Sequence, residues 1–357
     1  MKARLTVAER FVHETLQPKP FTDFNVIKKL DERRFVCERI ANRIAGRVSM
    51  ASRIEREDPQ LFVKFLKRDA DTIETQLRHL RDAHIGRVLL KGVESPYLLP
   101  SREFVHSPNY GYGVASEYYN HGSLERKLYD LELDQIAGVG MQVALGASAL
   151  HQAGIIHRDI KPENVVVKGN PNSGIPRVAI IDFDYVIPLK SQEQTKPDRQ
   201  YSRHIETEDD LWMRATLQGR TVGTPPYKSP EQCLGRNLTP LTDVYSTAIM
   251  LYFLLTQKIP EEYQGPNFSI VMNARAKEDK ISLITRMSRS KYGADFDNAF
   301  SALIMSVLTV NIYNRNFKDS ADPAREFARA LANLPWPADD PIRQEPFFIE
   351  ALANPNE

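Results

Sequence analysis

Three polar side chains with complementary chemistry stand close together in residues 155–167, a charged, turn-prone segment between an apolar helix end and an apolar strand. Asp159 offers a carboxylate that can orient a hydroxyl group and accept its proton. Lys161 can neutralise negative charge on a reacting group, and Asn164 offers an amide suited to a magnesium ion. A solvated charged turn is the alternative, but the order and spacing of the three groups argue against it.

A further carboxylate follows at the distance of a hairpin. Residues 178–181 are apolar and predict a strand that delivers Asp182 into a loop. An Asp at the end of a strand is commonly just a turn residue, so its place after the first loop is what favours a metal-binding role. Residues 168–176 are rich in Gly, Asn and Pro and suit the hairpin connection between the two segments.

These segments resemble the catalytic loop and the magnesium-binding motif of eukaryotic-type serine/threonine protein kinases. The resemblance implies that Asp159 and Lys161 are catalytic and that Asn164 and Asp182 hold the metal ions. Lys161, together with Thr224 in a Gly-Thr-Pro sequence, follows the serine/threonine version of the pattern.

Residues 221–231 add a third match, because they are similar to the end of the family's activation segment. In that family Glu231 pairs with a late arginine, and Arg315 stands at a matching place. Asp243 would brace the catalytic loop, although the N-terminal cap of an ordinary helix explains this residue about as well. Asp184 stands where the family has Gly, which reduces the flexibility of that turn.

Signals for nucleotide binding are weaker. Lys64 is the only cation in the apolar run 61–66 and is similar to the strand lysine that grips the nucleotide's phosphates; it would share the catalytic role. Its carboxylate partner on the next helix would be Glu74, although the apolar spacing fits slightly better if Gln76 holds that position.

The glycine-rich loop of the family is the largest departure. Counting back from Lys64, residues 41–48 fall at its place, where Gly46 alone remains of three glycines. We expect Gly46 and Val48 to lie against the nucleotide, with side chains in place of the other glycines that crowd or cap the site.

Residues 115–124 resemble the hinge, in which an extended backbone meets the edge of adenine. Glu117 and Tyr118 would make these contacts, with Ser116 as a small gatekeeper. The alternative is a strand that simply leaves the sheet.

Composition excludes several classes of protein. The chain has 357 residues, 42% of them hydrophobic, and its net charge of +1 gives no broad field for nucleic acid or anionic lipid. Cys37 and Cys233 are the only cysteines, and no apolar run approaches the length of a membrane span. The first residues also lack the apolar stretch of a secretory signal. We therefore expect a soluble, reduced, cytoplasmic protein without nucleic-acid partners or membrane insertion.

Apolar patterns predict two unequal lobes. Strand-like runs occupy residues 35–40, 47–51 and 61–66, and helical spacing occurs in residues 69–83, 136–151, 244–255 and 300–310. The resemblance implies a bilobal α+β fold with a small antiparallel sheet of five strands and one helix, followed by a larger, mainly helical lobe. We expect an extension at 1–33, a kinase domain at 34–334 (N-lobe 34–116, hinge 117–121, C-lobe 122–334) and an irregular, proline-rich tail at 335–357.

The resemblance implies transfer of the γ-phosphoryl group of ATP to serine or threonine hydroxyls of proteins, with Mg²⁺, or Mn²⁺ in its place. We also expect autophosphorylation in the activation segment, at Thr216 or Thr221. The alternative is that the acidic residues in 205–210 take the place of the phosphate permanently. Two alternatives stay open. A pseudokinase, acting as a nucleotide-binding scaffold or allosteric partner, is suggested by the eroded glycine loop; a small-molecule phosphotransferase would not need residues 221–231. The sequence predicts no particular oligomeric state.

Overall fold

The chain divides into two units, and the computed structural model describes residues 19–20, 22, 24–30, 32, 34–39, 60–65, 93–101, 103–127, 131–168, 174–183, 185–189, 223–224, 227–233, 237–256, 291–309 and 312–353. Unit 1 comprises Met1–Lys91 and Leu99–Tyr119, and unit 2 comprises Gly92–Leu98 and Asn120–Glu357. The chain passes from one unit to the other after residues 91, 98 and 119. The last crossing lies in the segment 117–121 that we predicted as a hinge, whereas Gly92–Leu98, which we placed in the N-lobe, belongs to unit 2.

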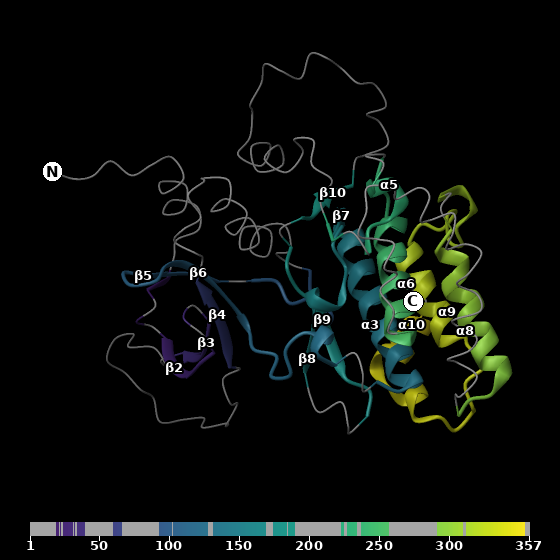
Figure 1. Ribbon diagram of the computed structural model, residues 1–357, viewed down its shortest axis with the longest axis horizontal. Coiled ribbons are helices and arrows are strands. Elements are labelled where there is room, and N and C mark those ends of the chain that lie inside the picture. Colours follow the sequence, from purple (N-terminus) through teal and green to yellow (C-terminus); the bar gives the residue numbers. More distant parts are fainter. Residues whose placement is uncertain are drawn as a thin grey trace, which may run out of the picture. The chain divides into compact units, whose positions relative to one another are not determined.

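Unit 1 contains one sheet in the order β1-β5-β6-β4-β3-β2 (Figure 1). All neighbouring strands are antiparallel except β1, which pairs parallel with β5. The strands are β1 Lys19–Pro20, β2 Phe24–Lys29, β3 Arg34–Arg39, β4 Leu61–Phe65, β5 Glu103–Ser107 and β6 Gly111–Glu117. The predicted antiparallel sheet is confirmed, but it begins before residue 34: β1 and β2 lie in the segment that we expected to be an extension.

Alternation along β4 shows which of its side chains pack into the apolar cluster of unit 1. Val63 and Phe65 are buried in a cluster with Phe35 and Cys37, whereas Lys64 between them is exposed. The rings of Phe35 and Phe65 meet edge to face with centroids 5.8 Å apart. Burial raises the pKa of the Cys37 thiol to about 11, so this cysteine stays protonated and unreactive at neutral pH.

Unit 2 is built around two buried helices, α3 Leu133–Gln152 and α6 Leu241–Thr256 (Figure 1). Glu132 and Gln135 cap the start of α3 reciprocally, each side chain bonding the other's backbone amide. The other helical segments are η4 Leu124–Lys127, η5 Pro162–Asn164, α5 Pro230–Cys233, α8 Ala294–Val307, η9 Ile312–Asn314, α9 Pro323–Ala332, η10 Pro341–Gln344 and α10 Pro346–Leu352. Helices predicted at 136–151, 244–255 and 300–310 are thus found as α3, α6 and α8; the one predicted at 69–83 lies outside the described residues.

Two short antiparallel ladders frame the polar loop of unit 2. β8 Val165–Lys168 pairs with β9 Arg177–Ile180, which places the predicted hairpin connection between them. β7 Ile155–Ile156 pairs with β10 Ile187–Pro188. The side chain of Gln142 on α3 donates to the carbonyl of Pro176 and accepts from the amide of Val178, so β9 is fastened to α3 at its first residues.

The predicted irregular tail is instead folded onto unit 2. Pro341 and Pro346 stand in the first turns of η10 and α10, where an amide hydrogen would have no helical partner, so the prolines start these helices instead of breaking them. Buried apolar side chains hold the segment against the helices, namely Trp336, Ile342, Phe347, Phe348 and Ala351. None of the helices in the described part of the chain has the length and hydrophobicity needed to cross a bilayer.

Candidate active site

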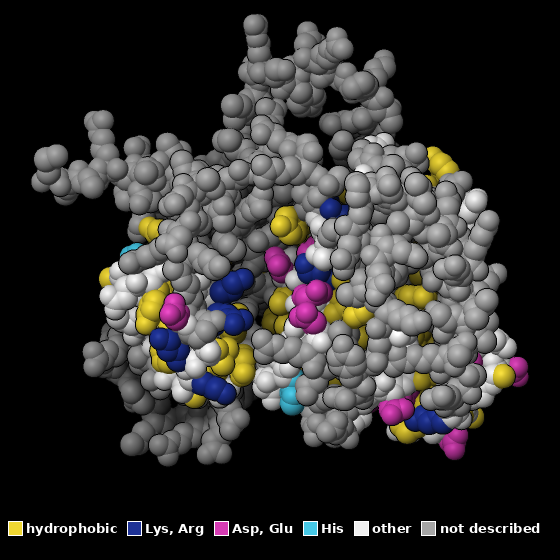
Figure 2. Space-filling model, viewed as in Figure 1, with side chains coloured by type: hydrophobic (Ala, Val, Ile, Leu, Met, Phe, Trp, Pro, Cys, Tyr) yellow, Lys and Arg dark blue, Asp and Glu magenta, His cyan; other side chains and the backbone are white. Residues whose placement is uncertain are grey.

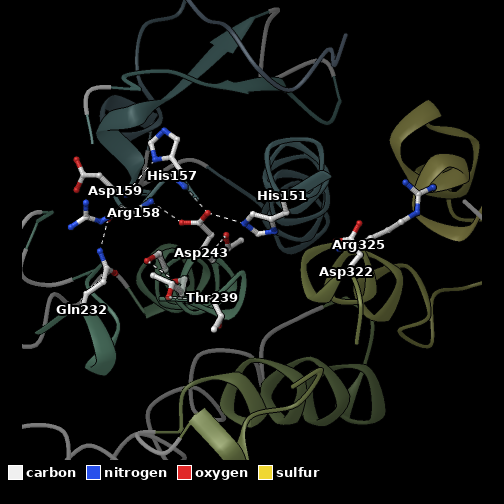
Figure 3. A network of polar contacts seen from close by, with 12 residues as sticks. His151, His157, Arg158, Asp159, Gln232, Thr239, Asp243, Asp322 and Arg325 are labelled. Atoms are coloured by element: carbon white, nitrogen blue, oxygen red, sulfur yellow. Dashed lines mark hydrogen bonds and ion pairs between the residues drawn. The ribbon is translucent and has the colours of Figure 1, made fainter. Parts of the chain in front are cut away.

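Asp243, in the first turn of α6, holds the loop that carries Asp159, and its side chain is fully buried. Oδ2 accepts from the His157 amide at 2.8 Å and lies 2.9 Å from Nε2 of His151, while Oδ1 accepts from the Arg158 amide at 2.9 Å (Figure 3). Burial alone would raise the pKa of Asp243, but these hydrogen bonds outweigh it and hold the pKa below its usual range. Because an ionised carboxylate only accepts, Nε2 of His151 carries the proton.

Two residues of the site adopt a left-handed backbone, Arg158 with φ of 72° and Asp182 with φ of 67°. This conformation is uncommon for residues other than glycine and costs about 1–2 kcal/mol per residue. The bond from the Arg158 amide to Asp243 stabilises the first of these two turns. Such strained positions cluster at functional sites. Asp184, which stands where the family has Gly, lies outside the described residues.

The Asp159 carboxylate is 3% exposed and accepts hydrogen bonds on both oxygens. Oδ1 accepts from the amide of Thr224 at 2.9 Å and from its hydroxyl at 3.0 Å. Oδ2 accepts from Nδ2 of Asn164 at 2.9 Å and lies 2.9 Å from Nζ of Lys161. The end of the activation segment thus meets the loop directly at the predicted catalytic carboxylate, and Lys161 lies beside it.

Asn164 is oriented so that its amide oxygen is left for a ligand. Both hydrogen bonds that its side chain makes with described residues use Nδ2, one to the Asp159 carbonyl and one to the Asp159 carboxylate, each at 2.9 Å. Its backbone carbonyl accepts from the amide of Ile181 at 2.8 Å, which brings the end of β9 beside it. An amide oxygen that has no partner among the described residues suits a hard cation such as Mg²⁺.

Asp182 follows directly and is half-buried. Among the described residues its carboxylate makes no hydrogen bond or ion pair, so it is free to bind a metal. The next residue, Phe183, is fully buried and packs edge to face on the ring of His157, with centroids 5.4 Å apart. The backbone is therefore held on both sides of Asp182, by the hydrogen bond from the Ile181 amide to Asn164 and by the packing of Phe183 on His157. Two oxygen donors at neighbouring positions fit a magnesium site.

The sequence reasoning missed two side chains that shape this loop. Gln232 on α5 donates through Nε2 to the Arg158 carbonyl at 2.8 Å (Figure 3), and His151 binds Asp243. A histidine near the end of a buried helix was visible in the sequence, whereas nothing there distinguished Gln232. The guanidinium of Arg158 is largely buried, which lowers its pKa, while Asp243 opposes the shift. Nη1 of Arg158 donates to the carbonyl of Tyr185 at 3.4 Å.

The predicted pair of Glu231 and Arg315 is present as a buried, two-pronged ion pair. Nη1 and Nη2 of Arg315 each lie 2.8 Å from one Glu231 oxygen, and the Thr242 hydroxyl donates to Glu231 at 3.1 Å. Burial alone would raise the pKa of Glu231, but the contacts with Arg315 hold it below the usual range. This pair fastens α5 to the rest of unit 2 and takes no part in chemistry.

The predicted nucleotide-binding residues fall in unit 1 and are described there only in part. Lys64 is on β4 and Glu117 is on β6, while the amide of Tyr118 donates to the carbonyl of Gln60 at 2.7 Å and is not available to adenine in this conformation. The other predicted residues lie outside the described part of the chain, namely Gly46, Val48 and Glu74. The hairpin next to β4 joins β2 to β3 through residues 30–33, and the predicted glycine-loop segment 41–48 lies outside the described residues.

Exposed basic side chains lie together on strands β2, β3 and β4 of this sheet. Arg34 on β3 lies directly opposite Lys64 on β4, and directly opposed residues share a face. Both side chains are exposed, as is Lys28 on β2. Figure 2 shows Lys and Arg side chains over β2–β4, and separately shows acidic and basic side chains together over β7 and β9 of unit 2. The basic side chains on β2–β4 thus place positive charge beside Lys64, the lysine predicted to bind phosphate, and this charge suits a phosphate group.

Comparison with known proteins identifies the family. The sequence profile of the family described as "Protein kinase domain" matches residues 45–321. The serine/threonine-protein kinase PknD of Chlamydia pneumoniae is 26% identical over 61% of this chain, which covers 24% of that protein. Two kinases of Myxococcus xanthus are also similar: Pkn1, 34% identical over 36% of this chain and 16% of its own length, and pkn3, 31% identical over 42% and 24%.

The chain spans about a quarter or less of the length of these curated relatives. The family profile, in contrast, covers most of this chain, including the loop at 155–167, the strand before Asp182 and the pair of Glu231 and Arg315. The resemblance and the bilobal fold class predicted from the sequence are confirmed. The chain therefore belongs to the protein kinase family.

Proposed function

We propose that the chain is an ATP-dependent enzyme that phosphorylates serine or threonine hydroxyls of other proteins. The observation that carries this proposal is the surroundings of Asp159, whose carboxylate accepts a hydrogen bond from an aliphatic hydroxyl, that of Thr224, at 3.0 Å. An acceptor hydroxyl that met the same carboxylate beside Thr224 would be oriented by Asp159 and would pass its proton to it.

The other groups of the site divide the remaining work. When bound, ATP would supply the γ-phosphoryl group and magnesium would offset its negative charge. Asn164 and Asp182 would hold the metal through oxygen atoms. Lys161, 2.9 Å from Asp159, would offset negative charge between the acceptor and the phosphoryl group, and Lys64 would bind the nucleotide's phosphates. A partnership of Lys64 with Glu74 stays a prediction.

Phosphate transfer from labelled ATP to a generic protein substrate tests the proposal. We expect label with the wild type, and a loss of about 100-fold or more with Asp159→Asn, because the general base is removed. Asp182→Ala should abolish the activity at every Mg²⁺ concentration. Asp319→Asn is the matched control, since this side chain is 87% exposed in unit 2. Equal label with Asp159→Asn and wild type would exclude the proposed chemistry.

Finer features of the proposal concern the acceptor. Lys161 and Thr224 together favour serine and threonine over tyrosine, as the sequence pattern indicates, and a comparison of peptides that differ only in the acceptor residue measures this.

Autophosphorylation is proposed at Thr216 or Thr221, which lie outside the described residues. Mass spectrometry of active protein with both threonines unmodified would contradict it. Protein substrates and a cytoplasmic location complete the proposal.

A pseudokinase scaffold is the second candidate, and one observation favours it. The hairpin next to the Lys64 strand turns at residues 30–33. None of these residues is glycine, so their side chains would hinder a close approach of the backbone to phosphate. ATP binding without transfer by the folded wild type would select this candidate over the first.

A further inference from the structure

Tyr97 connects the C-terminal helix to the strand that carries Asp182. Its hydroxyl donates to Oε2 of Glu350 on α10 at 2.6 Å. Its backbone carbonyl accepts from the amide of Ile180 on β9 at 2.8 Å, and Leu98 continues this contact as a parallel bridge to Ile180. Ile180 stands two residues before Asp182, so one chain of contacts runs from α10 to the proposed metal ligand.

Helix α3 leaves room for Tyr97 only because it has a glycine there. A Cβ atom on Gly146 would lie 2.9 Å from the Tyr97 carbonyl oxygen and 3.1 Å from Cδ1 of Ile180. Carbon atoms do not approach a backbone oxygen so closely without displacement. The segment with Tyr97, the strand β9 and the helix α3 are therefore in direct contact at this point.

Each end of the contact between Tyr97 and Glu350 is fixed. The Tyr97 side chain is buried, and burial together with the bond to Glu350 raises the pKa of its phenol, so the hydroxyl stays a donor at neutral pH. The backbone of Glu350 is held by Arg325, whose Nη2 donates to the Glu350 carbonyl at 3.0 Å. The amide of Arg325 in turn donates to Oδ1 of Asp322, the N-terminal cap of α9; both are labelled in Figure 3.

Strand β9 has two edges, and this contact holds only one of them. β8 pairs with the other edge over residues 165–168, and Gln142 fastens the start of β9 to α3. Loss of the bond between Tyr97 and Glu350 should leave these anchors in place. The fold would persist, and the end of β9 next to Asp182 would become less restrained.

We infer that Glu350 is a positioning residue for Asp182, acting through Tyr97 and the amide of Ile180. The inference rests on the proposed role of Asp182 in binding the metal. It also gives a role to α10, which lies after the part of the chain that the family profile matches, residues 45–321. The C-terminal segment 335–353 would then be part of the catalytic unit.

The test compares four variants of the full chain with the wild type: Tyr97→Phe, which removes only the hydroxyl, Glu350→Ala, Glu350→Gln and Glu345→Ala. Glu345 is the matched control, because it precedes α10, carries the same charge and makes no capping bond with its side chain. The readouts are the Mg²⁺ concentration that half-saturates binding of a fluorescent ATP analogue, and hydrogen exchange at the Ile180 amide.

We expect Tyr97→Phe and Glu350→Ala to raise the half-saturating Mg²⁺ concentration about three- to tenfold. This range corresponds to part of the free energy of one buried hydrogen bond to a charged group, because only part of it acts on the metal site. Exchange at Ile180 should rise with it. Glu350→Gln should stay close to wild type because its amide oxygen still accepts from the phenol, and Glu345→Ala should match wild type. Glu350 is only half-buried, so Glu350→Ala carries the test if Tyr97→Phe does not fold.

An unchanged Mg²⁺ dependence in folded Glu350→Ala would overturn the inference and leave the proposed function intact. A wild type that binds magnesium and ATP but transfers no phosphate would refute the proposed function, while the same titration still decides the inference. A wild type without any magnesium-dependent ATP binding would overturn both.

Discussion

Replacing Asp243 by alanine leaves three buried donors without an acceptor: the amides of His157 and Arg158 and the ring of His151, at 2.8, 2.9 and 2.9 Å. Each unsatisfied buried donor costs about 1–3 kcal/mol, and water entering the space left by the carboxylate offsets part of this, so we expect a loss of about 3–5 kcal/mol in the free energy of unfolding. Activity should fall as well, because the backbone next to Asp159 is no longer held.

Urea denaturation of wild type and Asp243→Ala, followed by circular dichroism, measures the loss, and phosphate transfer in the absence of urea measures the activity. The control is Asp297→Ala, which removes another buried Asp of unit 2 that does not contact the loop. The pKa of Asp243 is lower in the folded chain than its usual value, so its stabilisation is present above about pH 4 and is lost as the pH falls through the folded pKa.

Between about pH 5 and pH 3, the unfolding free energy of Asp243→Ala should therefore fall less than that of the wild type. The difference between the two should correspond to the titration of about one carboxyl group. An unfolding free energy within about 1 kcal/mol of wild type would contradict the reasoning, because it would mean that the three donors find other acceptors at little cost.

Three further substitutions test other parts of the structure. Gly146→Ala should lower the unfolding free energy by about 1–3 kcal/mol in a thermal or urea melt, despite the better helix propensity of alanine, because the new methyl group meets the Tyr97 carbonyl; a more stable variant would show that this contact relaxes freely. Thr224→Val should reduce kcat about three- to thirtyfold by removing the hydroxyl that donates to Asp159, whereas Thr224→Ser should retain most activity; equal rates would argue that the hydroxyl is not used. Arg34→Ala should raise the KM for ATP about threefold or more with little change in melting temperature, since an exposed cation beside the strand lysine is lost, and an unchanged KM would leave this charge without a role.

The polar loop and its neighbours could be predicted because they are local. Asp159, Asn164 and Asp182 stand within a short stretch whose apolar flanks fix one hairpin, and the structure keeps that order. The buried helices could be predicted for the same reason, since their apolar spacing depends only on the helix itself. The contacts that support the loop depend on distant partners instead: His151 meets Asp243 across 92 positions, and no sequence pattern connects them.

Two elements were misread for identifiable reasons. β2 is the edge strand of its sheet and leaves Val26 and Ile27 exposed, so its residues lack the alternation that marks a half-buried strand. The C-terminal segment was expected to be irregular because of its prolines, yet Pro341 and Pro346 occupy first turns of helices, where proline is favoured. Composition alone does not distinguish a proline that begins a helix from one that breaks it.

The bond between Tyr97 and Glu350 also sets an order of events during synthesis. The two residues are 253 positions apart, so at roughly 5–20 residues per second Tyr97 emerges roughly 10–50 s before its partner is made. A nascent chain long enough to contain Asp159 and Asp182 therefore still lacks α10. Under the inference above, the end of β9 beside Asp182 would become fully restrained only when translation has passed Glu350.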